Sequence, residues 1–179
     1  MAKIEKAQKI EKLENSKNKT ASNDLRIVGS EEWCTFKKLS IPAIKARVDS
    51  GAKTSSIHAN NIEIFSKNDE DWVRFEVDPI QDRPDILIKC EAKLIRTKKV
   101  KSSMGTSEER LMIRTRLTLG KDTFTIRLTL ASRDTMNYRM LLGREALNER
   151  YLINPAEHCL MGRLSKDEVL KRYDAVREK

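Results

Sequence analysis

The chain has 179 residues, of which 35% are charged and 39% hydrophobic, and its formal net charge is +9. This length suits one domain with extensions, and the composition is too apolar for a fully disordered chain. No stretch approaches the ~18 consecutive apolar residues that span a bilayer, and three scattered cysteines exclude a disulfide framework and a paired-cysteine metal knuckle.

Residues 1–31 differ from the rest, because they are rich in Lys, Glu and Asn with only a thin apolar stripe. We expect a flexible or helical N-terminal tail here, solvated by default, with a partner-binding helix as the alternative. The segment lacks the apolar run of a secretory signal. We therefore expect a cytoplasmic protein that makes no membrane contact.

Alternating apolar and polar residues then predict a series of strands, over 33–37, 44–48, 57–65, 72–77 and 86–95. The clearest pair is 111–119 and 123–130, which the short turn Gly120-Lys121-Asp122 joins into a hairpin with one buried face. A short helix is expected over 144–150. Ser165 and Glu168 form a capping box that opens a last helix within 164–179. The sequence thus predicts a mainly β domain over 32–163 with short helices and a C-terminal helix.

The sharpest local feature is Asp49-Ser50-Gly51, which directly follows an apolar strand. Aspartic peptidases use this order: an acid at the tip of a loop, a hydroxyl that braces the paired loop, and a glycine that lets backbone amides approach the carboxylate. Two such carboxylates share one proton and activate a water. The same tripeptide is also a common turn sequence, so a plain turn is the alternative.

A second feature is Leu141-Leu142-Gly143, an apolar strand that ends in glycine before the expected short helix. With the polar segment around Gly105 as a flap, the order is acid loop, flap, apolar-apolar-Gly and helix. This is the order of one retropepsin lobe.

These motifs resemble the bacterial retropepsin-like proteins labelled ATP-dependent zinc proteases. The matching stretches are 41–59, Ser103-Met104-Gly105 with Glu109-Arg110, and 139–147, within a resemblance that covers about 33–163. The resemblance implies a closed retropepsin-like barrel and catalysis by Asp49. Ser50 stands where the family usually has Thr, and it keeps the hydroxyl.

The Asp-Ser/Thr-Gly motif occurs once in the chain. A working pair of carboxylates therefore requires two chains, and we expect a homodimer with one Asp49 from each subunit. Asp49, Ser50 and Gly51 are the expected catalytic residues. Ala52 and Gly105 are expected to contact the substrate, and Leu141-Leu142-Gly143 to support the loop from behind.

The zinc in the family label finds no support in the sequence. There are two histidines and no His-Glu-x-x-His motif, whereas a catalytic zinc needs three close ligands. Asp49, His58 and Cys159 form a conceivable set, but their spacing does not require one. We expect no metal and no cofactor, a hydrogen-bonding or packing role for His58, and structural roles for His158 and Cys159 rather than a Cys-His nucleophile.

The excess of positive charge suggests an acidic substrate. Basic candidates are the outer hairpin face and two positions near the loop: Arg114, Arg116, Arg127, Lys53 and Arg144. A solvated sheet face is the alternative. The resemblance points to ligases that add glutamate tails to a ribosomal protein, so the expected substrate is a peptide or protein, with glutamate-rich tails as the candidate.

Two other functions remain open. One is a catalytically silent retropepsin fold that serves for binding. The other is a basic nucleic-acid-binding module, which is less favoured because only 5% of residues are aromatic and no helix-turn-helix pattern is present.

Overall fold

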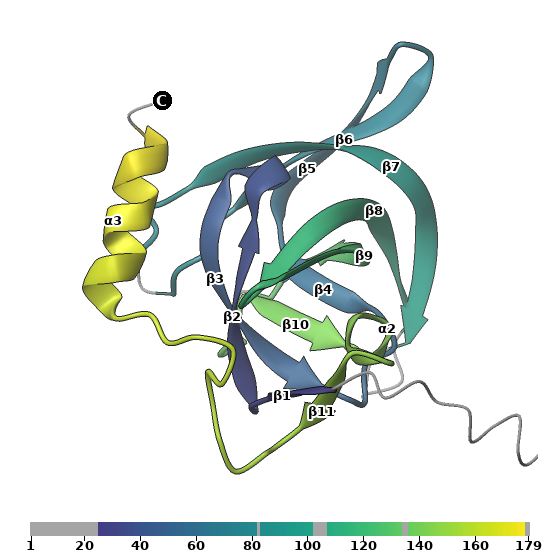
Figure 1. The fold of residues 1–179 in the computed structure, drawn as a ribbon. Coiled ribbons are helices and arrows are strands. Elements are labelled where there is room, and N and C mark those ends of the chain that lie inside the picture. The colour runs from purple at the N-terminus through teal and green to yellow at the C-terminus, as the bar shows by residue number, and fades with distance from the viewer. Residues whose placement is uncertain (1–24, 82, 102–106, 134–135, 178–179) are drawn as a thin grey trace, which may run out of the picture.

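The computed structural model describes residues 25–81, 83–101, 107–133 and 136–177. Figure 1 shows a β-barrel with one long helix on its outside. The elements in chain order are β1 Arg26–Val28, β2 Glu31–Phe36, the 3-10 helix η1 Lys37–Leu39, β3 Ile41–Asp49, β4 Ser55–His58, β5 Asn60–Lys67, β6 Glu70–Val77, β7 Ile88–Lys101, β8 Ser107–Leu119, β9 Asp122–Ala131, β10 Met140–Gly143, α2 Arg144–Leu147, β11 Tyr151–Ile153 and α3 Lys166–Arg177.

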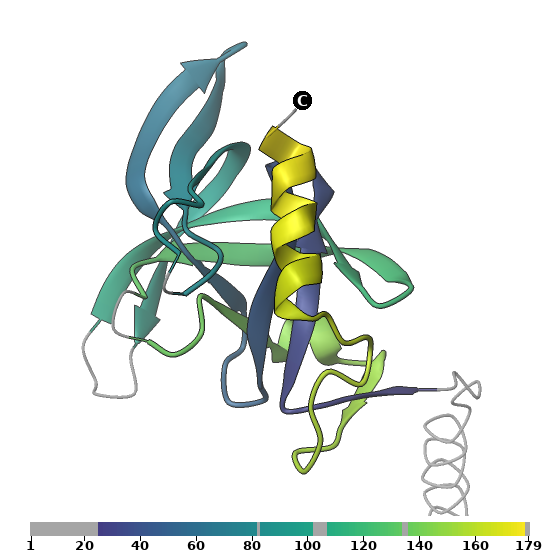
Figure 2. The same cartoon turned by 90° about the vertical axis from the view of Figure 1, so that its left-hand side faces the viewer.

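The barrel closes because the main sheet returns to its first strand. Its strands follow the order β2-β3-β10-β4-β9-β8, and β8 pairs back onto β2 through Cys34↔Leu119 and Thr35↔Thr118. Strands β7, β6 and β5 continue the sheet beyond β8, and the β5–β6 hairpin projects away from the barrel (Figure 2). This confirms the predicted mainly β closed barrel in a single lobe.

The β8–β9 hairpin forms as its alternation predicts. Ile113, Leu117 and Leu128 are fully buried, whereas the intervening residues of the other face are largely exposed. Leu119 pairs with Asp122, so the turn itself is only Gly120-Lys121. Gly120 has a positive φ of 57°, and a side chain there would meet the Met161 backbone, so this turn requires glycine.

One predicted strand is in fact two. The run 57–65 divides into two strands. β4 is buried throughout and is one of the barrel strands, whereas β5 pairs with β6 in the part of the sheet that continues beyond the barrel. Asn61 has a positive φ of 49° just after the division. The apolar positions also change phase at the division, from Ile57 and Ala59 to Ile62 and Ile64, and the prediction of one strand missed that change.

The folded part begins before the predicted boundary at residue 31. Strand β1 lies inside the segment predicted as tail, and it pairs in parallel with β11 to form a separate two-stranded sheet. β2 already starts at Glu31. The predicted tail residues 1–24 lie outside the described residues.

Helix α3 packs on the outside of the barrel against β3 (Figure 1). The predicted capping box is present: the Ser165 N–H donates to Glu168 Oε2 at 2.7 Å, and the Glu168 N–H donates to Ser165 Oγ at 3.2 Å. Tyr173 is buried, and its hydroxyl donates to the carbonyl of Ala43 in β3. No helix among the described residues is long and apolar enough to cross a membrane.

Candidate active site

The loop after β3 carries the Asp-Ser-Gly motif. Asp49 is half-buried, and its Oδ1 accepts hydrogen bonds from the N–H groups of Gly51 at 2.8 Å and Ala52 at 3.1 Å. These two backbone donors fix the orientation of the carboxylate. The Ser50 side chain is exposed in this single chain, so its bracing of a second loop stays a prediction.

Strand β10 lies directly beside the Asp49-Ser50-Gly51 loop. It runs parallel to β3 in the register Leu142↔Val48 and Gly143↔Asp49. A Cβ on Gly143 would lie 2.7 Å from the backbone carbon of Thr54, and the Gly143 N–H donates to Ser55 Oγ at 3.1 Å. Leu142 and Gly143 thus occupy the place expected for a support of the loop, and only glycine allows this close approach.

Arg144 holds the loop through its carbonyl groups. Its Nη1 donates to the carbonyl oxygens of Ser50 at 2.7 Å and Gly51 at 2.9 Å. The Arg144 N–H also donates to the Ala52 carbonyl at 2.9 Å. These contacts favour a positioning role for Arg144 over the substrate contact expected from the sequence.

Arg144→Gln is expected to loosen the loop. Losing a charged donor from two carbonyls should lower the free energy of unfolding by about 1–2 kcal/mol, and displacement of the Asp49 carboxylate should lower kcat about tenfold or more. Thermal unfolding and peptidase kinetics measure the two effects. Arg172→Gln, on the exposed side of α3, is the matched control and should change neither. Wild-type kcat in Arg144→Gln would contradict this role.

Two of the predicted basic residues, Lys53 and Arg127, lie next to the loop together with Lys98, which was not predicted. Lys98 Nζ donates to Thr54 Oγ1 at 2.8 Å, and Arg127 pairs with Glu145 at 2.9 Å. Burial lowers the pKa of Lys98, and the positive charges of Lys53, Arg96 and Arg127 lower it further, against the opposing effect of Glu145. Lys53 and Arg127 therefore belong to one basic cluster around Glu145.

The other two predicted basic residues, Arg114 and Arg116, line outer hollows of the β8–β9 hairpin. Arg114 is paired with Arg127 across the β8–β9 hairpin, and both line an outer hollow with Lys93 and Arg96. Arg116 lines a separate hollow beside Lys37 and Lys38. Arg127 therefore belongs both to this outer hollow and to the cluster beside the Asp49 loop, whereas Arg116 lies apart from them. Gly105, the predicted flap residue, lies outside the described residues.

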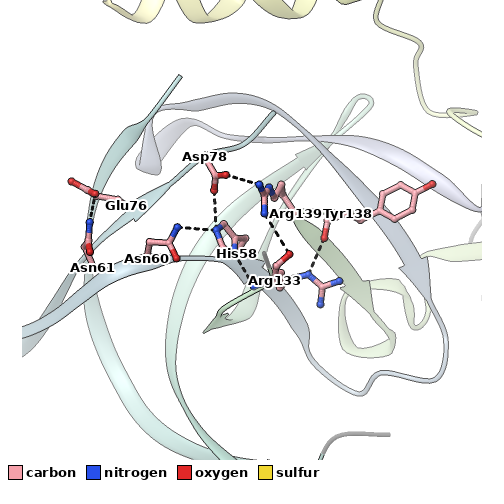
Figure 3. A network of polar contacts seen from close by, with 8 residues as sticks. All are labelled: His58, Asn60, Asn61, Glu76, Asp78, Arg133, Tyr138 and Arg139. Carbon is pink, nitrogen blue, oxygen red and sulfur yellow. Dashed lines mark hydrogen bonds and ion pairs between the residues drawn. The ribbon is translucent and has the colours of Figure 1, made fainter. Parts of the chain in front are cut away.

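A buried polar network that the sequence did not reveal ties the segment between β9 and β10 to the barrel (Figure 3). His58 is fully buried, its Nδ1 accepts the Arg133 N–H at 2.8 Å, and its Nε2 lies 2.9 Å from the Asp78 carboxylate. Arg139 pairs with the same carboxylate at 2.7 Å. This confirms the predicted hydrogen-bonding role of His58.

The three cysteines are poor nucleophiles. All are free and buried. Burial raises the pKa of Cys90 to about 12, and it also raises the pKa of Cys34 and of Cys159. A thiol with a raised pKa is not ionised near neutrality, so these side chains do not favour cysteine chemistry.

Within the described ranges, no three His, Cys, Asp or Glu side chains are grouped so that they could hold a metal ion. In particular, Asp49, His58 and Cys159 do not form such a group. The described residues therefore do not present a ligand set for the zinc that the family label implies.

Comparison with known proteins decides the family. The family model described as RimB-like, retropepsin-like aspartic endopeptidase RimB, matches residues 27–163. The chain belongs to the RimB-like family.

RimB-like sequences also occur inside longer proteins. Our chain is 52% identical over 148 residues to a probable alpha-L-glutamate ligase of Desulfotalea psychrophila, and 49% identical over 152 residues to one of Shewanella pealeana. The matches cover 83% and 85% of our chain but only 32% and 33% of those proteins, so it spans about a third of their length. These relatives carry a ligase name and not the zinc-protease label that the sequence suggested.

A solved structure shares the fold of this chain. The crystal structure of Lpg0085 from Legionella pneumophila, a protein of unknown function, aligns with this RimB-like chain at a TM-score of 0.64 and 28% identity. The alignment covers 78% of our chain and 99% of the Legionella chain. The barrel is therefore shared across the described part of the RimB-like domain.

Proposed function

We propose that this RimB-like chain is an aspartic peptidase that hydrolyses peptide or isopeptide bonds with paired Asp49 carboxylates. The observation that carries the proposal is the Asp49 carboxylate, which Gly51 and Ala52 hold at the end of β3. In such a pair one carboxyl is ionised and removes a proton from water as the water oxygen attacks the carbonyl carbon. The protonated partner hydrogen-bonds to the carbonyl oxygen, and the leaving nitrogen is protonated as the C–N bond breaks.

A single chain supplies only one such loop, so the active form requires a second copy. The β1–β11 sheet is the surface we propose for this contact. Three apolar side chains of the sheet are well exposed, Ile27, Leu152 and Ile153, as is Leu25 just before β1. In the part of the chain that the structure describes, this sheet contains only two strands. Open strand edges and exposed apolar side chains together favour pairing with another copy of the same sheet.

Glutamate-rich tails are the substrate that we propose. The relatives named as alpha-L-glutamate ligases contain this domain as about a third of their length, and a peptidase that removes what a ligase adds would act on the same glutamate residues. The cluster of Lys53, Lys98 and Arg127 beside the catalytic loop would attract such an acidic chain.

Hydrolysis of oligoglutamate and of a mixed peptide library, each with and without a chelator, tests this function. We expect cleavage of oligoglutamate that the chelator does not change. Cleavage of neutral peptides alone would refute the glutamate substrate but leave the peptidase. Loss of all cleavage in the chelator would refute the aspartic mechanism, and no cleavage by protein shown to be dimeric would favour a binding role.

A further inference from the structure

We propose that Arg133, with Arg110 beside it, is a specificity residue that binds a side-chain carboxylate of the substrate next to Asp49. This role rests on the proposed function, because it assumes that Asp49 marks the reactive centre. Neither arginine belongs to the basic residues that the sequence pattern indicates.

Arg133 is fixed at several points of its backbone and side chain. It follows β9, its N–H donates to His58 Nδ1 at 2.8 Å, and its Nε donates to the Tyr138 carbonyl at 2.9 Å. Among the described residues, neither terminal nitrogen of Arg133 has a hydrogen-bond partner. The fork of the guanidinium is therefore held in place while its outer donors are left for a ligand.

The support beneath Arg133 is buried and charged. His58 Nδ1 accepts a hydrogen bond from the Arg133 N–H, and its Nε2 lies 2.9 Å from the Asp78 carboxylate and 3.0 Å from the Asn60 side-chain amide. Asp78 also pairs with Arg139, whose Nη1 makes a longer contact of 3.4 Å to the Arg133 carbonyl (Figure 3). Tyr138 is in turn anchored by its hydroxyl on Glu31. Such a network pre-organises a side chain at little further entropic cost on binding.

The charges around Arg133 favour an anion. The guanidinium is half-buried, and burial lowers its pKa; the nearby Arg110 lowers the pKa further and the nearby Asp49 raises it. Arg110 is itself only 20% exposed, and its Nε and Nη2 donate to the exposed Glu108. The effect of Arg110 on Arg133 is larger than that of Asp49, and a carboxylate bound to the terminal nitrogens of Arg133 would offset the repulsion between the two guanidinium groups.

A carboxylate is the anion that fits this arrangement. An arginine fork matches a carboxylate by two parallel hydrogen bonds, and a rigid arginine loses little freedom when it makes them. Because Arg133 interacts electrostatically with Asp49, we expect the bound carboxylate to belong to a residue near the cleaved bond. A glutamate beside that bond is the side chain we expect Arg133 to read.

The test measures binding without catalysis. The anisotropy of a labelled hexaglutamate titrated with Asp49→Asn protein gives the reference Kd. A series of peptides with one Glu replaced by Gln then identifies which glutamate Arg133 binds. We expect Arg133→Gln in the Asp49→Asn background to weaken hexaglutamate binding about 10- to 100-fold, as for loss of a hydrogen bond to a charged group. Arg133→Lys keeps the charge but loses the two-pronged guanidinium, so its Kd should lie between those of the reference and of Arg133→Gln. The control Arg172→Gln should bind like the reference.

A double-mutant cycle separates recognition from positioning. If Arg133 binds one glutamate, one Gln substitution in the peptide should cost affinity in the reference protein and little in Arg133→Gln. Equal losses in both proteins at every position would overturn the proposal, as would unchanged hexaglutamate binding in a folded Arg133→Gln. If Arg133→Gln does not fold, the same comparison with Arg133→Lys decides. Coupling without any hydrolysis by wild-type protein would keep the carboxylate site while refuting the peptidase.

Discussion

Asp49→Asn is expected to lower peptide hydrolysis by about 10²–10⁴-fold or more while leaving the fold intact. An amide cannot remove a proton from water, so the general-base step is lost. The amide oxygen can still accept the N–H groups of Gly51 and Ala52, which hold the carboxylate at 2.8 and 3.1 Å. The loop should therefore keep its conformation.

Kinetics and thermal unfolding of the same preparations check this expectation. Asp69→Asn, in the exposed turn between β5 and β6, makes the same chemical change at a position with positive φ that Asn tolerates, and it should match wild type in both assays. Full activity in Asp49→Asn would refute catalysis by this residue. Loss of folding would mean that Asp49 acts mainly in structure.

Gly143→Ala is expected to damage both stability and activity. The added Cβ would lie 2.7 Å from the Thr54 carbon and 2.9 Å from the Ser55 nitrogen, and both are backbone atoms that cannot rotate away. Overpacking of this kind typically lowers the free energy of unfolding by about 1–3 kcal/mol. Since Gly143 is paired with Asp49, relief of the clash would also move the catalytic loop.

Urea unfolding measures the first effect and hydrolysis the second. Gly51→Ala is an informative companion, because its Cβ would meet only the Asp49 side-chain oxygen, at 3.1 Å. We expect Gly51→Ala to lower activity with a smaller change in the unfolding midpoint. A wild-type midpoint in Gly143→Ala would contradict the close approach of β10 to the loop.

The parts of the fold that the sequence predicted depend on local interactions. The Ser165–Glu168 box is specified by residues three positions apart. The β8–β9 hairpin needs only alternation and a short turn. The Asp-Ser-Gly loop and the strand ending at Gly143 could also be placed, because each has a compact motif.

The remaining features depend on contacts between distant parts of the chain. β1 carries no strong strand pattern. It is defined by its pairing with β11, and the barrel strands lie between the two in the sequence. Arg133 is recognisable only from His58, Tyr138 and Asp49, which the fold brings to it. The arginines of the β8–β9 hairpin could be assigned to one face from the alternation of the sequence. Alternation does not show which other parts of the chain lie next to that face.

A subunit-mixing experiment tests the paired-carboxylate account most directly. Wild-type and Asp49→Asn chains would be refolded together at varied ratios, and hydrolysis measured per wild-type subunit. If each site needs Asp49 from both subunits, an equal mixture leaves only about a quarter of the dimers active, so activity per wild-type subunit should fall in proportion to the wild-type fraction. Constant activity per wild-type subunit in mixtures shown to contain mixed dimers would contradict a shared site.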